Sequence, residues 1–406
     1  MKKALIILSA YIIFISTSIA KENNYDAEIK KLQNQINELS KKVQETEIKQ
    51  KNDLLDGFTI NGRLHIVANY YNIDKELKSY NTGSQYNNDF AIKRARITIG
   101  KQIDDFLFNF EVNYKKDKIF LGENFIAYNL NDTMTLRIGQ ILTPSFMERE
   151  RSSNTRASIN YDSFIGEGWI PDDYLIGLNY AIRTEKFGIS TGVFGNSTNN
   201  QGDLENDVDS DFLFRGYYTP LRNDIYTLHL GVDSSYRKFK TDASNNPDQI
   251  KNRFYYGLEF AFQYKYAIFT TEFIKLYHEY DKSRFNGNKF NFDGLYSELS
   301  VNFTGEKAVY NNYGCFGNID VKNPLSKGGF GAIQGLVRYS FADGEDYSNG
   351  FLNNIGTSYS YAAGLNWIPE NYFRILFGYS RNKITKKNYA AKGEYDSFKI
   401  ETRMFF

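Results

Sequence analysis

The sequence predicts an all-β fold, a 16-stranded antiparallel transmembrane β-barrel, with a helical segment ahead of it. Apolar and polar residues alternate with a period of two over many short segments, as in strands that have one apolar face. The chain contains 32 Tyr and 33 Phe but only 2 Trp, and aromatic residues favour strands and line the membrane interfaces of barrels. Tight connections also alternate with long polar ones, which is typical of a hairpin meander with short turns on one rim and long loops on the other.

The first 20 residues have the features of a secretory signal peptide. Lys2 and Lys3 precede the apolar stretch ALIILSAYIIFIS, and Ser18 and Ala20 are small residues at the two positions that a signal peptidase reads. We therefore expect residues 1–20 to be removed and the chain to be exported. Cys315 is the only cysteine, so it forms no internal disulfide, and it lies too far from the signal to carry a lipid anchor.

Residues 21–56 are expected to form a periplasmic coiled-coil helix. The apolar positions are spaced alternately four and three residues apart over about three heptads. The a and d positions are Ile29, Leu32, Ile36, Leu39 and Val43. A single amphipathic helix that lies against another surface is the alternative interpretation.

Residues 57–406 are predicted to form one barrel domain. Its strands are expected at residues 57–72, 89–101, 104–115, 121–130, 133–141, 173–184, 186–195, 210–219, 224–239, 252–265, 266–281, 290–304, 329–342, 356–368, 371–384 and 394–406. An even strand number closes an antiparallel sheet without an edge, and a barrel of 16 to 18 strands is wide enough for an aqueous channel. No uninterrupted apolar run after residue 20 approaches the roughly 20 residues that a spanning helix needs, so a helical membrane protein is excluded.

Alternation assigns the two faces of the first and last strands. In the last strand Phe398, Ile400 and Phe406 fall on the lipid side, and this strand is expected to pair with the first. In the first strand the same rule leaves Arg63 and His65 for the lumen.

Positively charged side chains are expected along the lumen. Alternation turns Arg94 and Arg96 inward from the second strand and Arg137 inward from the fifth, because a lipid-facing Arg at midplane would cost about 2 to 4 kcal/mol. The long connection 143–173 is expected to fold into the barrel and to bring Arg149 toward the pore. In a narrow, partly dehydrated pore a few such charges can bias permeation toward anions.

Several segments carry a family resemblance in a fixed order. They are GFTINGRLHI, FAIKRARITIGKQ, LRIGQILTPSFMERERSS, GLNYAI, LSVNFTGEKAVY, GLVRYSFADGED, YAAGLNWIPENYFRILFGYS and DSFKIETRMFF. Over residues 57–406 the chain resembles the phosphate-selective porin O and P family. That resemblance implies a homotrimer of 16-stranded barrels whose basic constriction passes anions such as phosphate or polyphosphate.

The resemblance also implies which residues border the constriction. Arg63 in NGRL and Lys93 and Arg94 in IKRA match the family's constriction residues, and FLGENF offers Gly122 or Glu123 for an inward carboxylate. Strict alternation puts Lys93 and Arg94 on opposite faces, so both reach the pore only through a bulge or at a strand end.

Other functions were weighed against a pore. Lys and Arg number 49 against 48 Asp and Glu, so the chain has no basic field for nucleic acid. The three histidines, His65, His229 and His278, lie in no recognisable nucleophile motif, so we expect no enzyme. The segment DVDSDF lacks the glycine and glutamate of a calcium loop, and neither a metal nor a cofactor is implied.

The remaining alternative is a non-conducting surface barrel that acts as an adhesin or binds polysaccharide. For either function we expect a Gram-negative outer-membrane location, with lipid and lipopolysaccharide around the barrel and the coiled coil near the cell wall. Small anions or other solutes would be the transported partners of a pore.

Overall fold

A computed structural model describes residues 33–38, 41, 57–74, 88–115, 118–158, 174–197, 208–240, 250–280, 289–344, 357–385 and 393–406. The chain divides into two units, residues 1–58 and residues 59–406. In the first unit residues 33–38 and Lys41 are helical, while the expected signal peptide and most of the expected coiled coil lie outside the described residues. Among the described residues, no helix is both long and apolar enough to cross a membrane.

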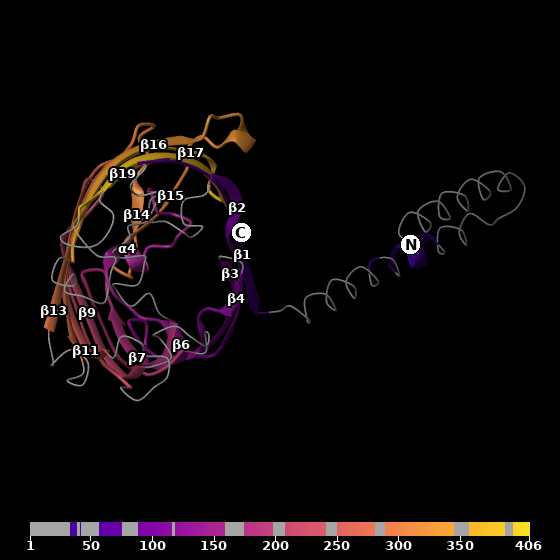
Figure 1. The fold of residues 1–406 in the computed structure, drawn as a ribbon. Helices are drawn as coiled ribbons and strands as arrows, with labels where there is room; N and C mark the ends of the chain where they lie inside the picture. Colours follow the sequence, from indigo (N-terminus) through magenta and orange to yellow (C-terminus); the bar gives the residue numbers. More distant parts are fainter. Residues whose placement is uncertain are drawn as a thin grey trace, which may run out of the picture. The chain divides into compact units, whose positions relative to one another are not determined.

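The second unit is a closed antiparallel β-barrel. Its strands are β1 (Phe58–Ile73), β2 (Asp89–Ile103), β3 (Phe106–Lys115), β4 (Lys118–Leu121), β5 (Asn124–Asn129), β6 (Met134–Leu142), β7 (Tyr174–Arg183), β8 (Phe187–Phe194), β9 (Val208–Arg222), β10 (Tyr226–Phe239), β11 (Ile250–Tyr264), β12 (Ala267–Tyr280), β13 (Lys289–Asn302), β16 (Ala332–Asp343), β17 (Thr357–Glu370), β18 (Phe373–Thr385) and β19 (Gly393–Phe405). These 17 strands form one sheet, in which β4 and β5 both pair with β3 and share one position, so the barrel has 16 positions. The strands form a ring in Figure 1. The predicted fold class and strand number are confirmed.

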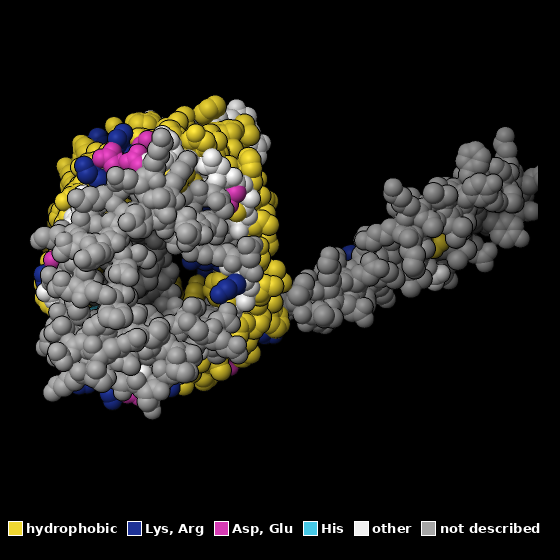
Figure 2. All heavy atoms as spheres, viewed as in Figure 1, with side chains coloured by type: hydrophobic (Ala, Val, Ile, Leu, Met, Phe, Trp, Pro, Cys, Tyr) yellow, Lys and Arg dark blue, Asp and Glu magenta, His cyan; other side chains and the backbone are white. Residues whose placement is uncertain are grey.

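Pairing of the first and last strands closes the barrel. Arg63 is opposite Phe405 at one end of this seam and Ile73 is opposite Tyr395 at the other. Gly62 and Phe406 then exchange two backbone hydrogen bonds of 3.1 Å each. Since a Cβ on Gly62 would lie 2.4 Å from the Phe406 ring, the absence of a side chain there lets the ring lie against the first strand. Figure 2 shows a mainly hydrophobic outer surface, as expected for a barrel in lipid.

The fourth barrel position differs from the prediction. A single strand over residues 121–130 was expected, but the strand begins at Lys118 and is interrupted between Leu121 and Asn124. The Asn124 side chain accepts a hydrogen bond from the Glu111 backbone N–H and donates one to its carbonyl, both at 3.2 Å. The Gly122 backbone N–H also donates to the Glu111 carbonyl at 2.9 Å, so a side-chain amide supplements an irregular backbone contact at this point.

The connection between β13 and β16, residues 303–331, folds into the barrel instead of forming a short turn. It contains β14 (Ala308–Tyr310), β15 (Phe316–Ile319) and the 3-10 helix η3 (Leu325–Lys327), and we call it the inner hairpin. In Figure 1, β14 and β15 lie within the ring of strands. A connection was expected here between two strands, but its inward fold was not predicted.

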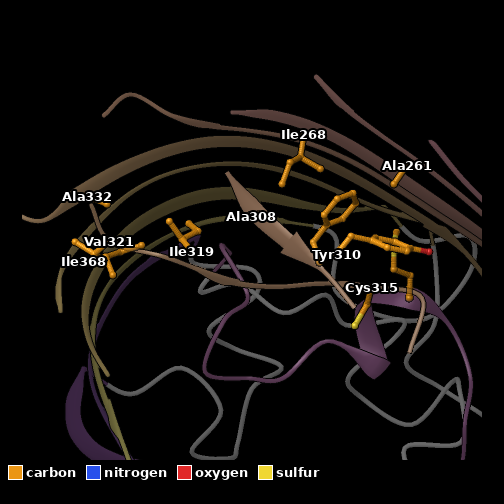
Figure 3. Close-up of a cluster of buried hydrophobic side chains, with 11 residues drawn as sticks. Ala261, Ile268, Ala308, Tyr310, Cys315, Ile319, Val321, Ala332 and Ile368 are labelled. Carbon is orange, nitrogen blue, oxygen red and sulfur yellow. The ribbon is translucent and has the colours of Figure 1, made fainter. Parts of the chain in front are cut away.

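The inner hairpin packs on a patch of the inner wall that is apolar. Figure 3 shows Ala261, Ile268 and Ile368 of the wall in one cluster with Tyr310 and Cys315 of the hairpin. All five side chains are buried, and Ala308, Phe316, Ile319, Val321, Ala332 and Met147 complete the cluster. Apolar residues at lumen-facing positions were the available signal, because a water-filled lumen would not favour them.

This packing predicts that Cys315 reports on the seating of the inner hairpin. Burial raises the pKa of its thiol to about 12, so little reactive thiolate forms at neutral pH and maleimide labelling should be slow. The substitution Ala261→Leu overpacks the cluster by about 1–3 kcal/mol, which should speed labelling by about 5- to 150-fold.

The control is Ala363→Leu, which changes an exposed position on β17. Labelling of the folded, heat-modifiable protein at pH 7 checks the expectation. Equal labelling rates in both variants and in the unsubstituted protein would contradict the packing described for Cys315.

Candidate functional site

The segment after β6 also folds into the barrel, as predicted for the long connection. Residues 143–158, here called the inner loop, include the short helix α4 (Met147–Glu150), which lies inside the ring in Figure 1. The backbone N–H of Phe146 donates to Asp233 of β10 at 2.8 Å, and the N–H of Glu148 donates to Glu272 of β12 at 3.3 Å. The wall carboxylates therefore satisfy the first turn of the helix.

An apolar contact also holds the inner loop against the wall. The Phe146 ring is fully buried and stacks on Tyr255 with centroids 5.7 Å apart. A Cβ on Gly257 would lie 2.3 Å from that ring, so this glycine provides the recess. Phe146 has φ of 49°, in the left-handed region, which its buried ring and its hydrogen bond to Asp233 hold in place.

A buried ion-pair network ties the inner loop to β13 and β16. Arg338 pairs with Glu148 at 2.6 Å and with Glu298 at 3.1 Å, and its guanidinium lies 3.7 Å from the centre of the Tyr296 ring. Burial raises the pKa of the Glu148 carboxyl, but Arg338, Arg156 and Arg151 together hold that pKa below its usual value. Glu148 is therefore ionised and the loop is fixed by charge.

The tip of the inner loop faces β1 and β2. Arg63 and Arg94 each donate a hydrogen bond to the Ser153 hydroxyl oxygen at 3.0 Å. Next to them, Asn154 lies 2.9 Å from His65 of β1. Two guanidinium groups from neighbouring strands thus converge on one neutral oxygen.

Lys93 lies on the same side of the wall as Arg94, which strict alternation did not predict. Its ammonium is 2.7 Å from Glu401, a fully buried carboxylate that also binds Arg403 of β19. The outward positions of β2 change from even numbers at Ile92 to odd numbers at Ile97. The alternation therefore slips by one residue between them, and Lys93, Arg94 and Arg96 all point inward.

Arg96 and Arg137 are held by polar partners. Arg96 pairs with Glu111 at 2.9 Å and donates to the Tyr174 hydroxyl at 2.8 Å. Arg137 donates to the Asn179 side chain at 2.8 Å and lies 3.8 Å from Glu123, which sits at the break between β4 and β5.

Arg149 does not join this group. It lies on α4 and is only 2% exposed, so the inner loop brings it into the barrel but not to an open surface.

Ser153 is the residue of the inner loop tip that was not predicted from the sequence. Its place beside MERER in the long connection was the only available signal.

The inner wall is asymmetric in the exposure of its cations. At the end of β9, Arg222 donates to the carbonyl of Tyr310 in the inner hairpin and is exposed. The other arginines on β9 to β19 that point inward are buried: Arg215, Arg237, Arg253, Arg338, Arg374 and Arg403. Four of these pair with carboxylates: Arg215 with Glu259, Arg237 with Asp211, Arg338 with Glu148, and Arg403 with Glu401. By contrast Arg63, Lys93, Arg94, Arg96, Arg137 and Arg183, on β1 to β7, are partly exposed. Figure 2 shows Lys or Arg side chains beside the central hollow.

The histidines and acidic residues also have wall partners. His229 is fully buried between the Tyr310 hydroxyl at 2.6 Å and Glu259 at 2.9 Å, so it joins the inner hairpin to the wall. Asp209 and Asp211, from DVDSDF, pair with Lys238 and Arg237. Within the described ranges no three His, Cys, Asp or Glu side chains gather as a metal site would require.

Solved structures share this fold at low sequence identity. The anion-selective porin from Comamonas acidovorans gives a TM-score of 0.54 at 10% identity and covers 86% of this chain and 99% of its own. The Salmonella typhi OmpF complex with daunomycin gives 0.54 at 9% identity, covering 86% and 97%. A loop L8 deletion mutant of OmpT from Vibrio cholerae gives 0.52 at 11% identity, covering 86% and 100%.

Direct comparison of the sequence with curated proteins finds no match. The sequence profile described as "Phosphate-selective porin O and P" matches residues 58–257 and 245–406, which together span the whole barrel. The chain therefore belongs to the phosphate-selective porin O and P family and is a porin of the Gram-negative outer membrane.

Proposed function

We propose that this porin is an anion-biased diffusion pore whose narrowest passage is bordered by the inner loop tip and by the wall of β1 and β2 that this tip contacts. The observation that carries this proposal is the convergence of Arg63 and Arg94 on the Ser153 hydroxyl at 3.0 Å. A hydroxyl oxygen is a weaker acceptor than an anionic oxygen, so a passing anion can displace it. Phosphate-like anions, with several acceptor oxygens, suit such paired donors.

The pairing and exposure of the cations also support a passage beside β1 and β2. Arg63 makes no ion pair among the described residues, whereas six inward arginines of β9 to β19 are buried. Lys93 keeps 39% of its side chain exposed although it pairs with Glu401. An anion that enters the lumen therefore meets accessible positive charge on β1 and β2.

The nearby carboxylates have a complementary function in this proposal. Glu111 is committed to Arg96, while Glu123 is 28% exposed and 3.8 Å from Arg137. A partly accessible carboxylate beside the basic wall keeps an anion from binding too tightly to leave, which conduction requires. Arg149 has no part in the proposed passage because it is buried.

The competing function is a non-conducting barrel that binds partners through its loops. Planar-bilayer recording of the purified protein separates the two, since only a pore gives stepwise current. We expect a homotrimer, so the current should change in groups of three equal steps. Chemical crosslinking in detergent checks the number of subunits.

The first functional prediction concerns ion preference. At an effective dielectric constant near 20, a fixed charge about 8 Å from a permeating ion changes the energy of that ion by about 2 kcal/mol. Removing two such charges should therefore change the ion preference even after screening by salt. We expect Arg63→Ala with Arg94→Ala to lower the anion-to-cation permeability ratio by at least about fivefold, measured from the reversal potential in a salt gradient. The effect should shrink in 1 M salt, where the Debye length is only about 3 Å.

A matched control removes two cations from the outer rim. Arg381 and Lys383 are 57% and 55% exposed and share Glu394 as partner. The variant Arg381→Ala with Lys383→Ala changes the net charge equally and should leave the reversal potential unchanged. A lumen variant that behaves like this control would remove Arg63 and Arg94 from the mechanism.

The second functional prediction concerns the inner loop. Gly257→Val would fill the Phe146 recess and forfeit about 1.5–3 kcal/mol of apolar burial, so the loop should leave the wall. We expect a higher single-channel conductance together with a weaker anion preference, because Ser153 would leave the basic wall. Gly216→Val on β9 is the control, since its Cβ would meet only movable side-chain atoms, the nearest at 3.1 Å. Unchanged conductance in folded Gly257→Val protein would show that the loop does not narrow the pore.

A further inference from the structure

The end of the lumen where the short turns lie carries a cation stacked on an exposed aromatic ring. Arg183 is the last residue of β7, and its guanidinium lies 4.4 Å from the centre of the Tyr313 ring. Tyr313 belongs to the inner hairpin, between β14 and β15, and is 47% exposed. Short turns of outer-membrane barrels face the periplasm, so this pair lies at the periplasmic mouth.

The wall holds the backbone around Tyr313 and leaves its ring in the lumen. Arg215 donates to the carbonyl of Tyr313 at 2.7 Å and to that of Gly314 at 3.1 Å, and the Tyr217 hydroxyl donates to the carbonyl of Asn312. Arg215 itself is fixed by Glu259 at 2.7 Å. Three consecutive carbonyls are thus bound by two side chains of β9, so the ring position is set before any solute arrives.

Arg183 has unused hydrogen-bonding capacity. Across the part of the chain that the structure describes, its side chain makes the contact with Tyr313 but no ion pair and no hydrogen bond. It is partly exposed, whereas Ala181, the preceding inward residue of β7, is fully buried. Stacking occupies one face of the guanidinium and leaves its N–H edge available for a carboxylate or phosphate.

We propose that Arg183 and Tyr313 form a second binding station, for organic anions that carry a carboxylate on a flat apolar body. The carboxylate pairs with the N–H edge of Arg183, and the flat body stacks on the exposed part of the Tyr313 ring. An inorganic anion makes only the first contact. The station rests on the proposed function for solute delivery, but its binding chemistry does not depend on conduction.

The station extends what the pore distinguishes. The passage at Ser153 offers charge and hydroxyl groups but no exposed ring among the residues that form it, so it selects by charge. At the periplasmic mouth, stacking on Tyr313 adds selection by shape. This stacking favours aromatic carboxylates over small inorganic anions as solutes.

Benzoate and inorganic phosphate are the probes, each added on both sides of a planar bilayer. The first readout is the concentration that halves the chloride current through the intact protein. The second is the dissociation constant for each probe with detergent-purified protein, measured by calorimetry, which needs no conduction. Heat-modifiable mobility confirms that each variant folds.

Arg183→Gln should raise both quantities by about tenfold for benzoate and for phosphate, since it removes a charged hydrogen-bond donor. Tyr313→Leu should raise them by about threefold or more for benzoate and leave phosphate within about twofold. Lys186→Gln, in the exposed turn after β7, is the matched charge control and should change neither.

The outcomes separate the two proposals. Anion-biased currents with benzoate binding unchanged in Arg183→Gln would overturn the station and leave the proposed function standing. No current, but calorimetric benzoate binding that needs Arg183 and Tyr313, would overturn the pore and support the station. Equal losses for benzoate and phosphate in Tyr313→Leu would overturn the assignment to flat organic anions.

Discussion

The structure depends on one constraint: inside a membrane each backbone N–H and C=O must find a partner within the protein, since lipid offers none. The seam between β1 and β19 meets it, with paired residues from Arg63 and Phe405 to Ile73 and Tyr395. Closure in turn fixes which side chains face lipid and which face the interior, because neighbours along a strand point to opposite faces. The distribution of charge inside this porin follows from closure.

The interior of the barrel has a filled side and a partly open side. Along β9 to β19 the inner loop and the inner hairpin cover the wall, and the space between them is filled by ion pairs such as Arg338 with Glu148 and by the cluster around Tyr310 and Cys315. Along β1 to β7 the wall keeps partly exposed cations. The two inserted segments enter from opposite ends of the barrel and meet where Met147 joins the cluster of the inner hairpin. The partly exposed cations of β1 to β7, on which the proposed function rests, therefore lie on one side of the lumen.

Sequence reasoning predicted the strands well because alternation is a local property. It placed all 16 barrel positions and put Arg63, Arg94 and Arg96 on the inner face, where the structure has them. It failed where backbone pairing is irregular or where contacts join distant segments. The slip in β2 that turns Lys93 inward and the Asn124 amide that interrupts a strand depend on neighbouring strands.

The burial of Arg149 and the placement of Ser153 between two arginines required knowing how the inner loop lies against the wall. The same holds for the inner hairpin, whose only trace in the sequence is a few apolar residues on the lumen side. Whether Arg63, Lys93, Arg94, Arg96, Glu123 and Arg137 set ion preference remains a prediction.

The division of the interior has an evolutionary consequence. Positions on the filled side resemble the core of a globular domain, where a change at one site demands compensation at another, so drift there is slow. Positions on the hollow side are partly exposed and carry polar partners, so a change there disturbs a hydrogen bond or an ion pair but not the packing of an apolar core. Under the proposed function, solute preference can therefore change by point substitution on β1 to β7 while the buried contacts that hold the two inserted segments stay intact.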